Sequence, residues 1–136
     1  VASIGWGVEQ MRRRYESDKI KFIGAVEYPP TKFYNSVDLF CNPSFIEANI
    51  NLTALEALAC ETPVIVSGCG GEEANIHKQF GIVSNPDKDS LKQNIALMEK
   101  KDLPRMGRAG RAVVLKDFNI KDMAEKVFKV YKETLA

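Results

Sequence analysis

Hydrophobic residues in this chain gather in short runs that alternate with helical patterns. Short runs that are almost entirely apolar are typical of strands covered on both faces. They lie at 2–5, 20–24, 37–41, 63–67 and 81–83. Helical spacing occupies the segments between and after them, at 8–16, 31–36, 52–60, 72–78 and 89–100. The alternation predicts a Rossmann-like α/β fold, a parallel sheet with helices on both faces.

The last third of the chain predicts two further helices, at 105–116 and 121–135. The second carries an apolar stripe at helical spacing, formed by Met123, Val127, Val130, Tyr131 and Leu135. We expect this helix to close the domain by packing on the sheet. A docking face for a partner domain is the alternative.

The segment 41–71 predicts a strand, a polar loop, a helix, a second strand and a glycine-rich turn. Glu47 lies in the loop and Glu56 in the helix. Ligands of parallel sheets bind at the carboxyl ends of the strands, where this helix also presents free N–H groups that favour an anion. Because carboxylates suit sugar and ribose hydroxyls, the segment indicates a nucleotide-sugar site.

Glu56 falls on a helical stripe with Leu52, Leu55 and Ala59. A carboxylate on a core-facing stripe is costly unless it is paired or faces a ligand. A position at the edge of the stripe, in contact with water, explains the pattern equally well.

The polar loop has ordinary explanations as well as functional ones. Glu47 can be a plain surface carboxylate. Asn49 and Asn51 are natural caps for the helix that follows, because their side chains accept bonds from its free N–H groups. The functional alternative is that the same loop lines a phosphate pocket.

Composition narrows the classes of function. A chain of 136 residues is one domain by length, and a net charge of +1 gives no strong field for nucleic acid or anionic membranes. No apolar run is long enough for a transmembrane segment. One histidine and three cysteines, at no zinc spacing, predict no metal site. Reduced thiols and a cytoplasmic location are expected.

Several runs together resemble a known family, the retaining GT-B glycosyltransferases of group 1 (family 4). The matching residues are 21–24, 37–44, 55–65, 70–71, 81–83, 106–111 and 117–118. The chain is similar to the C-terminal, donor-binding domain of these enzymes. The resemblance implies transfer of a sugar from a nucleotide-diphosphate donor to a hydroxyl acceptor, with retention and without a cofactor.

The resemblance also implies roles for particular residues. Glu47 would contact the donor sugar as the catalytic carboxylate, and Glu56 would bind the ribose hydroxyls. The diphosphate would meet backbone N–H groups of the loop and first helical turn, formed by Asn49, Ile50, Asn51 and Leu52. The base would lie near the strand end that holds Phe22, Gly24 and Val26.

The chain departs from the family pattern in spacing and at single positions. Glu47 and Glu56 have eight residues between them, whereas the family has seven, so one residue near Ala48 is inserted. Glu61 replaces a usual glycine, and Ile120 replaces a usual tryptophan. Because Glu56 would face the ligand, we expect its replacement by alanine to leave folding nearly unaffected.

Two parts of the family architecture are expected to lie outside this chain. One is a first strand–helix unit that carries a basic pair for the diphosphate. The other is the N-terminal domain that binds a glycan or lipid-linked acceptor. We therefore expect 1–136 to be a single nucleotide-sugar-binding domain that folds, does not catalyse alone and binds a donor at about millimolar concentration. A non-catalytic nucleotide-sugar-binding module is the alternative. A response-regulator-like domain is not supported, because this chain has no acidic cluster at the ends of its first predicted strands.

Overall fold

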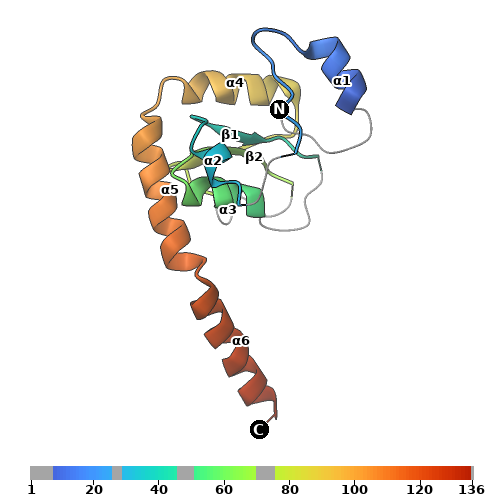
Figure 1. The fold of residues 1–136 in the computed structure, drawn as a ribbon. Helices are drawn as coiled ribbons and strands as arrows, with labels where there is room; N and C mark the ends of the chain where they lie inside the picture. Colours follow the sequence, from blue (N-terminus) through green and yellow to red (C-terminus); the bar gives the residue numbers. More distant parts are fainter. Residues whose placement is uncertain (1–7, 26–28, 46–50, 70–75, 136) are drawn as a thin grey trace. The chain divides into compact units, whose positions relative to one another are not determined.

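The computed structural model describes residues 8–25, 29–45, 51–69 and 76–135, which are drawn in colour in Figure 1. The chain divides into two compact units, Val1–Phe33 and Tyr34–Ala136. We describe each unit by itself.

The first unit contains the helix predicted at 8–16 but not the strand predicted at 20–24. Helix α1 (Val8–Tyr15) matches 8–16. Helix α2 (Thr31–Tyr34) is a single turn within the predicted 31–36, and its last residue belongs to the second unit. The prediction of a strand at 20–24 was wrong. Ile20 donates its N–H to the Ser17 carbonyl at 3.3 Å, and Phe22 donates to the Glu16 carboxylate at 3.5 Å, so local acceptors replace a neighbouring strand. The predicted strand at 2–5 lies outside the described residues.

The second unit is built on a parallel sheet of three described strands. They are β1 (Phe40–Asn42), β2 (Val64–Ser67) and β3 (Gly81–Ser84), in the spatial order β1-β2-β3. Cys41 is in register with Ile65, which is in register with Ile82. The predicted parallel sheet is therefore confirmed, and β1 begins three residues later than its apolar run.

Helices cover both faces of this sheet. Helix α3 (Leu52–Ala59) contacts β1 and β2, whereas α4 (Lys88–Met98) contacts β3. Figure 1 shows α3 and α4 on opposite sides of the strands. Val64, Ile65 and Val66 are each at most 1% exposed, so β2 is the centre of the core, as its unbroken apolar run predicts.

Side-chain caps set the starts of the next two helices. Asp87 accepts a bond from the Ser90 N–H at 2.8 Å, so α4 starts one residue before the predicted 89–100. Asp102 accepts from the Arg105 N–H at 3.0 Å and opens α5 (Leu103–Asp117), which was predicted at 105–116. Each cap satisfies an N–H group that has no acceptor within its helix.

Helix α3 ends in a left-handed turn at Glu61, whose φ is +63°. Thr62 donates its N–H to the Ala57 carbonyl at 2.9 Å, and Glu61 donates to the Leu58 carbonyl at 3.0 Å. These two bonds form a Schellman motif, in which the left-handed position is usually glycine. The left-handed conformation at Glu61 fits the glycine that the family resemblance implies at this position.

We expect Glu61→Gly to stabilise the domain by about 1 kcal/mol, because a side chain at positive φ strains the backbone. Urea unfolding followed by circular dichroism measures the change. The side chain of Glu61 lies 3.9 Å from the Arg111 guanidinium, and Glu61→Gln controls for the loss of that exposed pair. A Glu61→Gly variant less stable than Glu61→Gln would contradict the argument.

The C-terminal helix does not pack on the sheet as predicted. None of the residues of α6 (Ile120–Leu135) is buried, and Figure 1 shows the helix running away from the strands. Met123, Val127, Val130, Tyr131 and Leu135 of the apolar stripe are all at least 42% exposed. The faces of the sheet are already occupied by α3 and α4, so the alternative of a docking face fits this helix better.

The predicted helix at 72–78 is only partly testable, since 70–75 lie outside the described residues. Ile76 and His77 are not helical, and the segment turns at His77, whose carbonyl accepts bonds from the N–H groups of Phe80 and Gly81 at 3.0 Å. The described part of this prediction was therefore wrong.

Candidate functional site

The segments that follow β1 and β2 lie together at one edge of the sheet. Ser44 donates its hydroxyl to the Asn42 side chain at 2.8 Å, and Cys69 donates its thiol to the Ser44 carbonyl at 3.3 Å. Both strands are parallel and end here, so this is the carboxyl edge at which ligands of such sheets bind.

Helix α3 begins at this edge with a capped first turn. The Asn51 side chain accepts from the Ala54 N–H at 3.2 Å and from the Thr53 hydroxyl at 2.5 Å, which confirms Asn51 as the cap. No acceptor among the described residues bonds the N–H groups of Leu52 and Thr53. These groups and the helix dipole make the first turn suitable for an anion.

Glu56 lies one turn further along α3 and is held by a tyrosine. The hydroxyl of Tyr34 donates to Oε2 of Glu56 at 3.1 Å. Glu56 is half-buried, and its other oxygen, Oε1, accepts no hydrogen bond from the described part of the chain. The carboxylate therefore has one fixed oxygen and further acceptor capacity for a ligand hydroxyl.

Tyr34 is itself positioned by packing. Its side chain is 4% exposed, and its ring meets Phe40 edge-on with centroids 5.5 Å apart. Its carbonyl accepts from the Thr62 hydroxyl at 2.9 Å. Burial, followed by the bond to Glu56, raises the pKa of the Tyr34 phenol above its ordinary value, so the phenol stays a neutral donor.

The stripe assigned to α3 from sequence was wrong. The buried face is formed by Ala54, Ala57 and Leu58, whereas Leu52 is 70% exposed. Glu56 therefore flanks the buried face. Because Glu56 is the acceptor of a buried phenol, we expect Glu56→Ala to reduce stability, in contrast to the sequence-based expectation that folding would be nearly unaffected.

The ligand-binding roles of all the predicted site residues stay predictions. Glu47, Asn49, Ile50 and Val26 lie outside the described residues, so convergence of Glu47 with Glu56 stays a prediction. Phe22 and Gly24 belong to the unit Val1–Phe33 and stay predictions as base contacts.

Sequence reasoning missed Tyr34 and Thr62 as parts of the site. Tyr34 is 22 positions before Glu56, and no local pattern joins them.

No disulfide joins the three cysteines, all of which lie within the described ranges. Cys41, Cys60 and Cys69 are half-buried, and burial raises the pKa of the Cys41 thiol. Within the described ranges, no three His, Cys, Asp or Glu side chains gather in a way that could hold a metal ion.

Comparison with known families gives the fold a name. A family model described as "Glycosyl transferases group 1" matches residues 2–101 of the chain. The chain belongs to the group 1 glycosyltransferases. The open parallel sheet with helices on both faces is accordingly the Rossmann-like half of a GT-B fold.

Individual members of this family align over most of the chain. A GDP-mannose-dependent monoacylated alpha-(1-6)-phosphatidylinositol monomannoside mannosyltransferase from Corynebacterium glutamicum is 29% identical over 126 residues, which is 84% of this chain. Sucrose-phosphate synthase from Thermosynechococcus elongatus matches with a TM-score of 0.81 and 27% identity over 95% of the chain. A glycosyltransferase from Rickettsia africae matches with a TM-score of 0.77 and 25% identity over 93%.

This group 1 glycosyltransferase chain spans about a third of the length of these relatives, namely 32%, 34% and 35%. None of the helices in the described ranges is long and apolar enough to cross a membrane.

Proposed function

We propose that this group 1 glycosyltransferase chain binds the nucleotide-diphosphate sugar from which a retaining transferase takes its sugar. The observation that carries the proposal is the pairing of Glu56 with Tyr34 beside the open first turn of α3. A fixed carboxylate and a set of unpaired N–H groups are complementary to the two polar parts of a nucleotide, the ribose and the diphosphate.

In this proposal Glu56 accepts hydrogen bonds from the ribose hydroxyls. Oε2 is held by Tyr34, so the side chain does not need to be ordered by the ligand, and less entropy is lost on binding. Glu47 is proposed to contact the donor sugar. Phe22, Gly24 and Val26 are proposed to lie near the base.

The diphosphate is proposed to lie at the start of α3. Bond cleavage at the anomeric carbon leaves negative charge on the departing nucleoside diphosphate. The N–H groups of Leu52 and Thr53, the helix dipole and the loop residues Asn49, Ile50 and Asn51 would stabilise that charge. The proposal assigns no role to a metal ion or cofactor.

One relative supports the class of donor. The mannosyltransferase from Corynebacterium glutamicum is GDP-mannose-dependent by name, and it aligns with 84% of this chain. Its acceptor is a phosphatidylinositol mannoside. A hydroxyl of a glycan or lipid-linked glycan is the corresponding acceptor class proposed here, bound through a part of the protein outside this chain.

A binding experiment on this chain tests the proposal. Saturation-transfer NMR with GDP-, UDP- and ADP-sugars should detect one preferred donor with a Kd of about 1 mM, or about 4 kcal/mol. Glu56→Gln should weaken binding by about 1–3 kcal/mol, about fivefold to a hundredfold, because it removes a charged acceptor. The glutamine can still accept from Tyr34, so this variant tests ligand binding with little effect on the fold.

Glu61→Gln is the matched control, because it neutralises a half-exposed carboxylate just past the end of the same helix. Equal losses in the two variants would refute the role of Glu56. Micromolar binding, or sugar transfer by this chain alone, would show that the site is complete and that its residues are misplaced. Donor binding without transfer in the longest available form would favour the non-catalytic module.

A further inference from the structure

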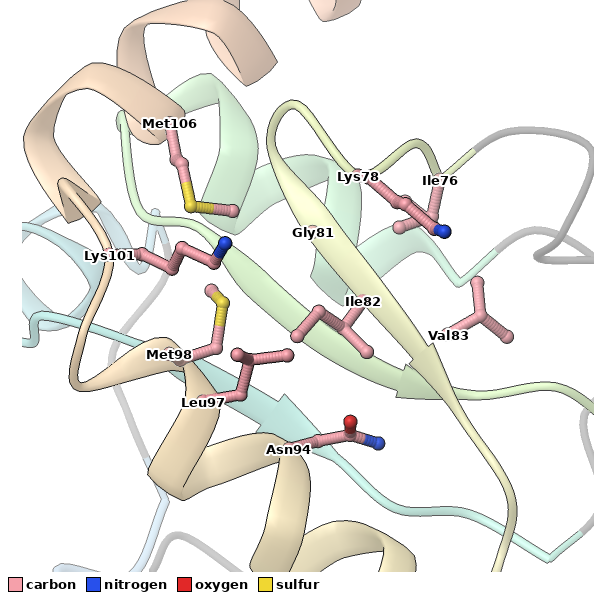
Figure 2. A pocket seen from close by; sticks show the side chains of 10 residues that line it. All are labelled: Ile76, Lys78, Gly81, Ile82, Val83, Asn94, Leu97, Met98, Lys101 and Met106. Atoms are coloured by element: carbon pink, nitrogen blue, oxygen red, sulfur yellow. The ribbon is translucent and has the colours of Figure 1, made fainter.

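A cavity lies beside β3, the last strand of the described sheet. Its volume is about 530 Å³, and it opens between β3, α4 and the start of α5 (Figure 2). Its apolar wall includes Ile82, Leu97, Met98 and Met106. It shares no residue with the proposed donor site on α3, so an inference about it does not depend on that proposal.

Two lysines lie on the rim of this cavity. Figure 2 shows Lys101 reaching from the turn after α4 towards the strand, between Met98 and Met106, with Lys78 on the other side of β3 in this view. No carboxylate lines the cavity, and neither lysine forms an ion pair within the described ranges. Two positive charges therefore lie beside an apolar wall, with no carboxylate partner among the described residues.

From this arrangement we infer that the cavity binds an amphipathic anion, an aliphatic chain that ends in a carboxylate or phosphate. The volume lies within the range of small-molecule sites, which is roughly 300–1,000 Å³. The chain would lie against Ile82, Leu97 and Met98, and the head group would meet Lys101 at the mouth.

The properties of the lining residues favour this class of ligand over others. Unbranched methionine side chains adapt to an aliphatic chain of variable shape. Lysine ammonium groups recognise carboxylate and phosphate as point charges without a fixed geometry. A hydrophilic anion would gain nothing from the apolar wall, and an uncharged chain would gain nothing from Lys101.

The four methionines of this chain provide a direct test. Met98 and Met106 line the cavity, whereas Met11 and Met123 do not. In protein labelled at the methionine methyl carbons, octyl phosphate and octanoate should shift the Met98 and Met106 resonances saturably and leave those of Met11 and Met123 in place. Inorganic phosphate should shift none of them, and octanol should bind at least about fivefold more weakly than octyl phosphate.

Two variants and one control sharpen the test. Lys101→Gln should weaken binding of octyl phosphate about threefold to fivefold, as expected for the loss of one partly exposed charge pair. Lys129→Gln neutralises an exposed lysine on α6, away from the cavity, and should change nothing. Leu97→Trp fills the cavity from a position that is 45% exposed, so it should abolish binding while circular dichroism confirms the fold.

Several results would overturn the inference. Parallel shifts of all four methyl groups would indicate non-specific association of the ligand. Equal binding of octanol and octyl phosphate, or equal effects of Lys101→Gln and Lys129→Gln, would show that the cavity does not recognise an anionic head group. If neither octyl phosphate nor octanoate shifts a methyl resonance, the cavity does not bind amphipathic anions. Met98 and Met106 shifts that depend on protein concentration alone would assign the cavity to a second copy of the chain.

Discussion

Replacing Gly107 with alanine should lower the free energy of unfolding by about 3 kcal/mol. Gly107 lies on α5 where that helix crosses the end of α3. A Cβ atom at this position would lie 1.7 Å from the Glu61 carbonyl oxygen and 2.5 Å from its carbon. Backbone atoms cannot rotate away as a side chain can, so the two helices would have to separate.

The sign of this effect distinguishes it from helix propensity. Glycine to alanine inside a helix ordinarily stabilises a protein by about 0.5–1 kcal/mol. Urea unfolding of Gly107→Ala should therefore show a change opposite to the ordinary one. Arg108→Ala, at the exposed neighbouring position, should change stability little. A Gly107→Ala variant as stable as the unchanged chain would mean that α3 and α5 do not approach so closely.

Replacing Tyr34 with alanine should cost about 3–4 kcal/mol of stability. The side chain is 4% exposed and packs edge-on against Phe40, so its removal leaves a cavity and also strips Glu56 of its donor. Thermal and urea unfolding measure the loss.

Tyr34→Phe separates the two contributions of this side chain. The ring stays in place, and only the hydroxyl that bonds Glu56 is lost, so we expect a cost of about 1 kcal/mol. Combining Tyr34→Phe with Glu56→Ala, which removes the acceptor, gives a double-mutant cycle, and a coupling energy near zero would contradict the hydrogen bond. A loss in Tyr34→Phe as large as in Tyr34→Ala would contradict the role of ring packing.

Much of the second unit could be predicted from sequence because its strands carry their own signal. The run 63–67 begins with a proline and continues with three β-branched apolar residues, and β2 is fully buried as such runs require. The cap at Asn51 was equally readable, since a polar side chain precedes an apolar helical segment.

The wrong predictions share a physical cause: a local sequence pattern does not show which other segment the residues will contact. The run 20–24 has strand composition, yet the N–H groups of Ile20 and Phe22 bond Ser17 and Glu16, which lie nearby in the sequence. The apolar stripe on 121–135 predicts that this helix packs against another surface, but it does not show which surface that is. The bond between Tyr34 and Glu56 joins two elements through the fold, so it became visible only in three dimensions.

The tight crossing of α3 and α5 has a consequence for the far end of α3. This helix has eight residues and is about 12 Å long, and Gly107 packs closely against the backbone just past the end opposite Asn51. If a helix of this length tilts by about 5° about one end, its other end moves by about 1 Å. Displacements of that size are enough to impair a site that depends on exact alignment. Substitutions at the α3–α5 crossing can therefore change the orientation of Glu56 and of the first helical turn without altering any residue that is proposed to contact the donor.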